Sequence, residues 1–449
     1  MSSQIEKCIG SGGFGKVYEV EGTNLYKKEM NLKFHENLRE VCFLSSYNQV
    51  SFITEMVRCE IDKDKDMITL YMKNAGETLR NLCKKLNMKE RIKLVPVLLT
   101  QFARILIWMK EENIIHGDIK PANICIDNNL FVRLIDWGFV QKVYKGNVYS
   151  NGTPIFSEPD AFHNKRIDHE SEMFAFGLSI CYFLSNGLDY DEWEDFLYDY
   201  DVDENYDEEK IESKNEEALK ILQFDILKTY FLEVFGDYNY YNIICSMLNL
   251  NKDKRIDDIT LFELCPSDLK IKYPLTECYT HIESRLSTSV PEFQKSLNNK
   301  KLGVLFNWLI NLKFKLKIKA SLFNAIQLFF RYIKKKEVNN DNLQYVGIIC
   351  LYISNIMNNE YIFTIQKCAT VCCVKDTNIM MNILVDILNT LEYNVFPESE
   401  NIEFNKRNED AFANVFITSS QIFSLPFIDS SSFNLFYNNF KLKNNIKNI

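Results

Sequence analysis

Glycine, proline and histidine are scarce in this sequence, whose 449 residues include 15 glycines, nine prolines and five histidines. The low glycine content excludes a collagen-like repeat, and the scattered histidines argue against a structural zinc site. No apolar run approaches the ~20 residues that a helix needs to cross a bilayer, and the first ten residues lack the apolar segment of a secretory signal. The sequence therefore predicts neither a fibrous protein, nor a membrane-spanning one, nor a secreted disulfide scaffold.

The composition is that of an ordinary globular protein. Apolar residues make up 46% of the sequence and charged residues 25%, which is enough for a hydrophobic core in two or three domains of roughly 150 residues each. Without a secretory signal, the 13 cysteines are expected to be reduced thiols, which predicts a cytoplasmic or nuclear location. Asparagine, lysine and isoleucine are frequent, as in proteins encoded by AT-rich genomes such as those of large DNA viruses and some parasites. A protein of such a virus would act in the host cell.

Negative charge is concentrated in one segment of the chain. Residues 188–217 contain 15 acidic residues and two lysines, so the rest of the chain is mildly basic although the whole sequence has a net charge of −9. The simplest interpretation is a solvated, partly disordered insert, and a docking site for basic peptides is the alternative.

A glycine-rich segment near the N-terminus has the spacing of a phosphate-binding turn. The sequence IGSGGFGKVY begins at Ile9 and contains the pattern G-x-G-x-x-G. A dinucleotide-binding fold is not favoured, because no buried strand precedes the glycines and the following KVYEV alternates like a strand. A strand–turn–strand flap over phosphates fits better. The residues predicted to contact a nucleotide are Ile9, Gly10, Ser11, Gly12, Gly13, Phe14, Gly15 and Val17, with Val17 over the base.

The next predicted strand offers two adjacent lysines as phosphate ligands. In the sequence NLYKK, which ends at Lys28, period-2 alternation places Leu25 and Lys27 on one face. We therefore assign Lys27 to the α- and β-phosphates and retain Lys28 as the alternative.

A lysine with this role is usually oriented by a glutamate on a helix. The sequence ENLREVCFL, which begins at Glu36, is predicted to be helical. Glu40 is preferred to Glu36 as the partner, because Glu36 lies only nine residues after Lys27 in the chain.

Two polar clusters in the middle of the chain carry the most specific chemistry. The sequences IIHGDIKPANICID and FVRLIDWGF begin at residues 114 and 131, and each places polar residues beside an apolar run. Phosphoryl transfer needs one carboxylate near the acceptor hydroxyl, which Asp118 provides, and oxygen ligands for Mg2+, which Asn123 and Asp136 provide. Lys120 lies two residues beyond Asp118 and is predicted to neutralise the γ-phosphate.

These motifs, in this order, resemble those of a eukaryotic-type serine/threonine protein kinase over residues 1–265. The resemblance implies an α+β two-lobed fold, with an N-lobe over 1–73 and a C-lobe over 74–265, that binds ATP and Mg2+ between the lobes. It also implies protein substrates that bear serine or threonine. Within the sequence LYMKNAG, which resembles the hinge strand between the lobes, Met72 is the expected gatekeeper, and Lys73 and Ala75 would offer backbone groups to adenine.

Further resemblances follow in the second half of this region. The sequence GTPIFSEPD, which begins at Gly152, resembles the substrate-binding end of an activation segment. Its last three residues stand where Ala-Pro-Glu is usual, so Asp160 is predicted to pair with Arg255. Thr153 resembles the threonine that contacts the catalytic aspartate, and Glu172 replaces an aspartate at the start of a buried helix.

Three positions depart from the family pattern. Gly117 replaces the arginine that usually receives an activation-loop phosphate, so activity is not expected to need that phosphate. Trp137 replaces the phenylalanine of the metal loop, which covers residues 136–138. Leu25 is bulky where an alanine usually covers the adenine.

Two other functions remain open. The sequences around Asp118 and Asp136 also resemble small-molecule phosphotransferases of the aminoglycoside and choline type. Lys120, the complete glycine flap and the peptide-seating segment at Gly152 oppose that reading. A catalytically weak kinase fold that acts as a scaffold is the second alternative.

The last third of the chain is predicted to be helical. A linker over 266–299 contains three prolines, and helical periodicity then predicts helices over 300–313, 319–335, 341–357 and 377–391, with a less clear one over 361–373. The pattern over 300–397 resembles a cyclin box, and an unrelated five-helix domain is the alternative. A C-terminal extension covers 398–449.

The cyclin-like region also departs from its family. Cyclins that activate kinases hold the kinase helix with a lysine and a glutamate, and Asn355 and Leu384 stand at those positions. We expect either a different grip or none, and we hypothesise that this domain presses in cis on the helix that bears Glu40.

A basic set of residues in the same region is a second candidate surface. Nucleic acid is an unlikely partner, because no base-reading or aromatic pattern accompanies these residues, and a solvated face is the preferred interpretation. The set comprises Lys313, Lys315, Lys317, Lys319, Arg331, Lys334, Lys335 and Lys336.

Overall fold

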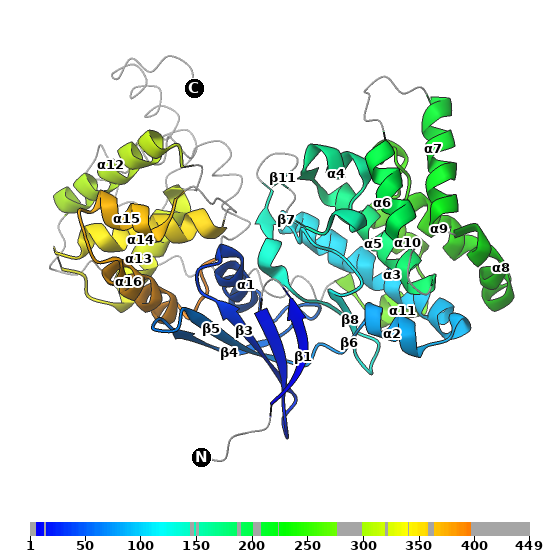
Figure 1. Cartoon of the computed structure of the whole chain (residues 1–449), viewed down its shortest axis with the longest axis horizontal. Helices are drawn as coiled ribbons and strands as arrows, with labels where there is room; N and C mark the ends of the chain where they lie inside the picture. Colours follow the sequence, from blue (N-terminus) through cyan, green and yellow to red (C-terminus); the bar gives the residue numbers. More distant parts are fainter. Residues whose placement is uncertain are drawn as a thin grey trace.

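A five-stranded sheet lies between two helical bodies in the computed structural model (Figure 1). The structure describes residues 6–12, 15–143, 148–149, 152–185, 190–200, 208–222, 224–275, 299–318, 322–339, 341–357 and 363–396. The sheet and its helix form the N-lobe, the larger helical body forms the C-lobe, and a separate helical domain contacts the N-lobe from the opposite side. The α+β two-lobed architecture followed by an all-α domain is thus as the sequence predicts.

The N-lobe sheet is antiparallel, with strand order β1-β2-β3-β5-β4. The helix α1 (His35–Ser46) packs against it and buries nearly all of its residues. The strands are β1 (Glu6–Gly12), β2 (Gly15–Val20), β3 (Leu25–Asn31), β4 (Met56–Asp62) and β5 (Met67–Lys73).

The C-lobe is built around α3 (Met88–Glu111) and α5 (His169–Leu184). Among the described residues, α3 is the one helix that by length and composition could cross a membrane, and 89% of its apolar window is buried inside the protein. It is therefore the core helix of this lobe. The other helices are α2 (Leu79–Lys85), α4 (Pro159–Asn164), α8 (Phe224–Phe235), α9 (Asn239–Met247), α10 (Asp258–Leu264) and α11 (Ser267–Lys272).

Short strands in the C-lobe hold the loops that face the N-lobe. A three-stranded sheet joins β6 (Glu77–Thr78), β8 (Ile124–Ile126) and β9 (Val132–Leu134), and the chain between β7 (Ile114–Ile115) and β8 carries Asp118. β7 also pairs with β10 (Gln141–Lys142), which follows Asp136. These pairings place both predicted polar clusters at the same edge of the C-lobe. A further pair joins β11 (Val148–Tyr149) and β12 (Arg166–Ile167).

The acidic insert is more ordered than predicted. Its described parts form α6 (Tyr190–Asp199) and α7 (Glu208–Ile221). Trp193 and Leu197 are fully buried, and the Trp193 ring stacks on Phe196 with centroids 5.0 Å apart. Most residues of α6 and α7 are exposed or half-buried, so the insert is solvated as predicted. The prediction of a loop is wrong for α6 and α7, because apolar side chains at helical spacing attach α6 to the C-lobe.

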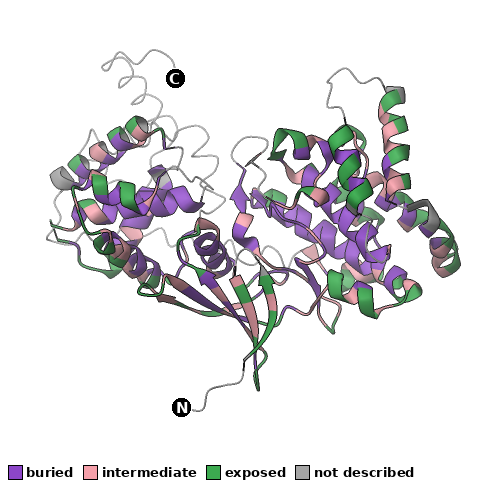
Figure 2. Ribbon diagram, in the orientation of Figure 1, coloured by how far each residue is buried: buried purple, intermediate pink, exposed green. Residues whose placement is uncertain are grey.

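The C-terminal domain contains the predicted helices, and its core is continuous (Figure 2). The helix α14 lies in its centre and is buried along nearly its whole length. The helices are α12 (Asn299–Leu316), α13 (Leu322–Lys335), α14 (Leu343–Met357), α15 (Ile365–Val371) and α16 (Thr377–Thr390). The predicted linker contains α11, and the predicted extension over 398–449 lies outside the described residues.

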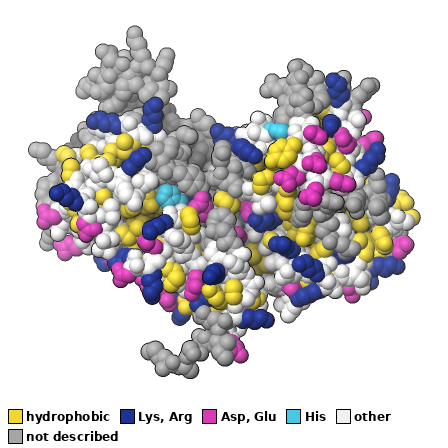
Figure 3. Space-filling view, viewed as in Figure 1, with side chains coloured by type: hydrophobic (Ala, Val, Ile, Leu, Met, Phe, Trp, Pro, Cys, Tyr) yellow, Lys and Arg dark blue, Asp and Glu magenta, His cyan; other side chains and the backbone are white. Residues whose placement is uncertain are grey.

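Several members of the basic set make contacts within the domain rather than forming a free patch. Arg331 donates to the Asn394 carbonyl, Lys335 to the Thr390 carbonyl, and Lys336 forms an ion pair with Asp386. On the face shown in Figure 3, basic side chains of this domain form separate spots. These contacts support the interpretation of a structural and solvated face.

Candidate active site

A buried lysine joins the N-lobe to the C-lobe, and it is Lys28. Its Nζ lies 2.7 Å from Glu40 Oε2 on α1 and 2.8 Å from Asp136 Oδ1 of the metal loop. The expected pair of Lys27 with Glu40 is therefore wrong, and Lys28, the retained alternative, makes this pair. Lys27 instead pairs with Glu29 at 2.9 Å and lies 4.7 Å from the centre of the Tyr18 ring.

The strand register explains this correction. Successive residues of β3 point to opposite faces, so Lys28 shares the inner face with Tyr26 and Met30 while Lys27 lies on the other face. Both lysines are buried, so alternation of apolar and polar residues could not distinguish the two faces. Because the lysine that pairs with Glu40 is one residue later than predicted, the residue expected to cover the adenine becomes Tyr26 instead of Leu25.

Lys28 stabilises both carboxylates, which repel each other, so burial and Asp136 together still raise the pKa of Glu40 above its usual value. Burial by itself lowers the pKa of Lys28, but Glu40 and Asp136 outweigh that effect and raise the pKa above its usual value. Burial acts to raise the pKa of Asp136, and Lys28 overcomes it and holds the pKa below its usual value. Lys28 is therefore a permanent cation at neutral pH, and Asp136 an anion.

The glycine flap is a hairpin, as predicted. Gly12 and Gly15 face each other where β1 and β2 meet, while Gly13 and Phe14 lie outside the described residues. Gly15 has φ +144°, and a Cβ there would lie 2.1 Å from the Glu29 carbonyl oxygen. A side chain at this position would therefore push β2 away from β3.

The hinge amides are partly engaged within the N-lobe. Met72 is buried at the end of β5, where a gatekeeper would lie. The Lys73 N–H donates to the Glu55 carbonyl, and the Asn74 N–H donates to the Asn24 carbonyl. Contacts of adenine with the Lys73 carbonyl and the Ala75 backbone stay predictions.

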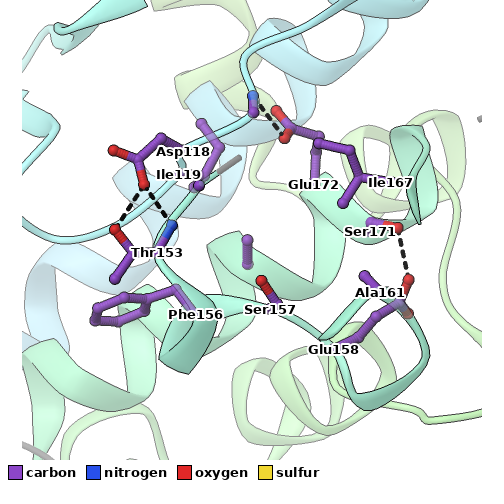
Figure 4. A pocket seen from close by; sticks show the side chains of 13 residues that line it. Asp118, Ile119, Thr153, Phe156, Ser157, Glu158, Ala161, Ile167, Ser171 and Glu172 are labelled. Atoms are coloured by element: carbon purple, nitrogen blue, oxygen red, sulfur yellow. Dashed lines mark hydrogen bonds between the residues drawn. The ribbon is translucent and has the colours of Figure 1, made fainter. Parts of the chain in front are cut away.

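Asp118 lies in the catalytic loop, residues 116–123, and its carboxylate is held from several sides (Figure 4). Its Oδ1 accepts hydrogen bonds from the Thr153 N–H at 2.9 Å and the Thr153 hydroxyl at 2.7 Å. Its Oδ2 accepts from Asn123 Nδ2 at 3.0 Å and lies 2.7 Å from Lys120 Nζ. Lys120 also donates to the Thr153 hydroxyl at 2.8 Å, so the four residues form one network.

Two oxygen-bearing side chains face the cleft as candidate metal ligands. Asp136 has a left-handed backbone conformation, with φ 64° and ψ 59°. Asn123 uses its amide nitrogen to bind Asp118, which leaves its oxygen as the atom that can bind a cation. No group of three or more acidic, histidine or cysteine side chains forms a metal site within the described residues. A cation here would need phosphate oxygens to complete its ligands, as Mg2+ does in nucleotide sites.

The rings of His116 and Trp137 lie beneath this site. The Trp137 ring is fully buried, with its centre 4.4 Å from His116 and 4.3 Å from Phe43 of α1. His116 Nε2 lies 3.1 Å from the Ile135 carbonyl, and its Nδ1 accepts the Asp118 N–H at 3.2 Å. The imidazole is therefore neutral, with the proton on Nε2.

A pH dependence follows from this neutral imidazole. Burial lowers the pKa of His116 to about 4 from 6.5, so only the unfolded chain binds a proton between these values. We expect the unfolding free energy to fall by about 2 kcal/mol through this group as the pH falls from 6.5 to 5. Urea denaturation of the protein and of His116→Gln at both pH values measures this difference. His163→Gln, which changes an exposed histidine, serves as the control, and an equal pH dependence in all three proteins would contradict the expectation.

The end of the activation segment is anchored by Glu158 rather than Asp160. Arg255 Nη2 lies 2.6 Å from Glu158 Oε2, and both side chains are almost fully buried. The predicted Asp160–Arg255 pair is therefore wrong by two residues, so the sequence Phe156-Ser157-Glu158 takes the position of Ala-Pro-Glu. Lys252 reinforces the anchor through Glu158 at 2.8 Å.

A small pocket lies behind this segment, between the catalytic loop and α5 (Figure 4). The carboxylate of Glu172 accepts the N–H groups of His116 and Gly117, each at 3.1 Å, and so positions the catalytic loop. Gly117 has φ +84° and packs closely against Gly152 of the activation segment. A Cβ built on Gly152 would lie 2.2 Å from the Gly117 carbonyl oxygen. The residue type at both positions is thus fixed by backbone packing.

Sequence reasoning missed one buried residue of this region. Arg39, which precedes Glu40 on α1, is fully buried and donates to the Gly138 carbonyl at 2.7 Å. In the sequence Arg39 stands beside the charged Glu40, and its own partners are remote in the chain, so no local pattern indicated that it is buried.

Comparison with known proteins gives the same arrangement of domains. The family model for the protein kinase domain matches residues 3–265, and the model for the N-terminal domain of cyclins matches residues 275–396. A serine/threonine-protein kinase/receptor of Acanthamoeba polyphaga mimivirus is 30% identical over 184 residues, which cover 38% of this chain and 11% of that protein.

Two cellular kinases show a similar degree of likeness. The catalytic subunit of cAMP-dependent protein kinase from Dictyostelium discoideum is 25% identical over 40% of this chain. A G2-specific protein kinase of Schizosaccharomyces pombe is 26% identical over 39% of it. The chain spans 29% of the length of each of these two relatives.

The kinase match covers more than half of the chain and includes each side chain described above around the cleft. Family members use a nucleoside triphosphate with a divalent metal ion. Asn123 and Asp136 provide ligand atoms of the type that such an ion requires. The cyclin-type match coincides with the separate helical domain. This chain belongs to the protein kinase family and carries a cyclin-type domain behind its kinase domain.

Proposed function

We propose that this protein transfers the γ-phosphate of ATP to serine and threonine hydroxyls of proteins, with Mg2+ as the metal. The observation that carries the proposal is the single network of Asp118, Lys120, Asn123 and Thr153 opposite the Lys28–Glu40–Asp136 cluster. Lys120 of the network also acts electrostatically on Asp136 of the cluster, so the two groups lie near each other.

Each side chain has a role that follows from its charge and partners. Lys28 would hold the α- and β-phosphates, since Glu40 fixes its ammonium group. Asn123 and Asp136 would hold Mg2+, which neutralises the phosphate oxygens when bound. Catalysis then depends mainly on positioning and on fixed charges.

Proton transfer and charge stabilisation fall to the catalytic loop. Asp118 would orient the substrate hydroxyl and accept its proton, because its carboxylate is held in one orientation by Thr153 and Asn123. Lys120, 2.7 Å from Asp118, would stabilise the negative charge of the transferring phosphoryl group. Its contact with Thr153 ties this lysine to the segment that would seat the peptide.

The anchored activation segment favours a protein substrate over a small molecule. Glu158 and Arg255 fix the segment that begins at Gly152 beside the catalytic aspartate. This arrangement supports the peptide-binding interpretation, and the dense network of catalytic contacts supports an enzyme over a scaffold.

The test is phosphate transfer from labelled ATP with Mg2+ to a mixture of casein, histone and myelin basic protein. We expect labelled phosphoserine and phosphothreonine from the wild type and no label with Asp118→Asn. Labelled phosphotyrosine alone would contradict the proposed specificity. Nucleotide binding without transfer to any of these proteins would favour a small-molecule substrate or a scaffold.

We also propose that the protein acts in the cytoplasm or nucleus, where its cysteines would stay reduced.

We propose in addition that the cyclin-type domain sustains activity in cis. The domain contacts α1, the helix that bears Glu40: Ser45 Oγ donates to the Glu392 carbonyl at 2.6 Å. Ser46 Oγ lies 3.2 Å from Asn394 Oδ1. A domain that holds this helix also holds the Lys28–Glu40 pair.

A further inference from the structure

The cyclin-type domain contacts α1 without the lysine and the glutamate by which activating cyclins hold the kinase helix, so its grip is different. Asn355 and Leu384, which stand at those positions, are both buried within the domain. The charge at the interface comes from the kinase side instead. Arg39 of α1 reaches the C-terminal end of α14, 317 residues away in the chain.

Arg39 bridges two backbone carbonyls that belong to different domains. Its Nε donates to the Ile356 carbonyl at 2.9 Å, and its Nη1 donates to the Gly138 carbonyl of the metal loop at 2.7 Å. Ile356 lies in the last turn of α14, whose carbonyls lack partners within the helix and carry the negative end of its dipole. The guanidinium is fully buried, so both bonds form away from water.

A column of aromatic rings, each in contact with the next, forms a second connection between the cyclin-type domain and the kinase domain. Phe396, which follows α16, contacts Phe43 edge-on with centroids 5.2 Å apart. Phe43 stacks on Trp137 at 4.3 Å, and Trp137 contacts His116 at 4.4 Å. Four rings thus connect the end of the cyclin-type domain to the catalytic loop.

The end of the column is fixed to α1 by hydrogen bonds. Ser46 Oγ accepts the Phe396 N–H at 3.2 Å. The ammonium group of the buried Lys142, on β10, lies 5.8 Å from the centre of the Phe396 ring and donates to the Tyr47 hydroxyl at 3.0 Å. Removing the domain would leave Phe43 and Tyr47 facing water.

From this geometry we infer that Arg39 is a positioning residue that makes the metal loop depend on the docked cyclin-type domain. The inference rests on the proposed kinase function and names its regulation. With Gly138 tied to Ile356 through one guanidinium, this restraint on the backbone that follows Asp136 exists only while α14 lies against α1. No phosphate on the activation segment is required for this order, in agreement with Gly117 in place of the usual arginine.

The energetic reason is the desolvation of the guanidinium. A buried cation needs acceptors, and each carbonyl that it loses removes part of the compensation of its charge in a region of low dielectric. The guanidinium of Arg39 therefore holds the Ile356 and Gly138 carbonyls together. Displacement of α14 would favour a new position of Arg39, and the Gly138 carbonyl would follow or lose its donor.

The test compares Arg39→Met with Arg58→Met in the full-length protein. Arg58 lies on β4 with an exposed side chain, so it controls for the loss of an arginine. We expect the kcat of Arg39→Met to fall on the order of 10²-fold while the KM for the protein substrate changes little, since a displaced metal ligand impairs the transition state. Arg58→Met is expected to match the wild type.

A second readout does not require transfer. The Mg2+ concentration for half-maximal binding of a non-hydrolysable ATP analogue is expected to rise about tenfold in Arg39→Met, since outer ligands tune metal affinity. Calorimetry measures this value without a protein substrate. A wild type that binds the analogue but transfers no phosphate would overturn the proposed function and leave this comparison valid.

The role of the docked domain is tested by Phe396→Ala. Because Phe396 and Arg39 act on one metal loop, the double variant should lose little more kcat than the more affected single variant. Treatment of the wild type with a serine/threonine phosphatase should leave its kcat unchanged. The inference is overturned if folded Arg39→Met keeps wild-type kcat and Mg2+ dependence, if the two losses multiply, or if phosphatase treatment inactivates the enzyme.

Discussion

Lys28→Met is expected to lower kcat/KM for ATP by roughly 10² to 10³-fold, while Lys27→Met changes it by no more than about threefold. The two lysines are adjacent in sequence and equally buried, so they form a matched pair. Only Lys28 contacts Glu40 and Asp136, whereas Lys27 contacts Glu29 and the Tyr18 ring. Steady-state kinetics with labelled ATP measures both variants under the same conditions.

Removal of Lys28 also leaves the buried Glu40 carboxylate and the partly exposed Asp136 carboxylate without their cation, which can cost about 3–5 kcal/mol of stability. Lys28→Arg separates this effect from catalysis, since the charge stays while the donor geometry changes. We expect this variant to fold and to remain strongly impaired. Thermal unfolding followed by circular dichroism verifies the fold of each variant at the assay temperature. A large loss in Lys27→Met with little loss in Lys28→Met would show that the register of β3 is shifted by one residue.

Gly117→Arg, which introduces the arginine that the family usually has, is expected to lower rather than raise activity. Gly117 has φ +84°, and a Cβ at this position would lie 2.9 Å from the Phe139 carbonyl oxygen. The strained backbone and the close contact together should lower the unfolding free energy by about 2–4 kcal/mol. Displacement of the neighbouring Asp118 should lower kcat on the order of 10²-fold.

Two alanine variants separate the causes of this effect. Gly236 has φ +78° and no atom within 4 Å of a Cβ built on it, so Gly236→Ala measures the backbone strain alone, about 1–2 kcal/mol. Gly117→Ala adds the close contact with Phe139. Urea denaturation should therefore rank Gly236→Ala, Gly117→Ala and Gly117→Arg in order of increasing loss. A fully active and stable Gly117→Arg protein would contradict the observed backbone conformation.

The comparison of Lys27 with Lys28 shows where sequence patterns lose their information. Alternation along a strand identifies a buried face only when the other face is exposed. Lys27 and Lys28 point to opposite faces of β3, and both are buried. The sequence pattern therefore fitted either lysine equally well. The contact with Glu40 distinguished them. The prediction of Glu40 itself succeeded because Glu36, one turn earlier on the same face of the helix, lies too close to the lysine in the chain.

The anchor of the activation segment failed for a similar reason. Glu158 and Asp160 are both acidic and lie two residues apart near a proline, so the position of the motif was ambiguous. Only the buried pair with Arg255 distinguishes them, and that contact joins distant parts of the chain. In the acidic insert, the high charge concealed the apolar side chains of Trp193 and Leu197, which bury one face of α6.

By itself the sequence determined the kinase-type fold, the helical domain behind it and the residue types of the catalytic chemistry. These features depend on local spacing: the glycine flap, the polar residues around Asp118 and Asp136, and the helical period of the last third. The tertiary structure alone decided that Lys28 joins the lobes and that Arg39 and Phe396 tie the metal loop to the cyclin-type domain. Such contacts join residues about 100 to 350 positions apart. No local periodicity specifies them, because they arise only when separate elements pack together and a buried charge or ring must find its partner.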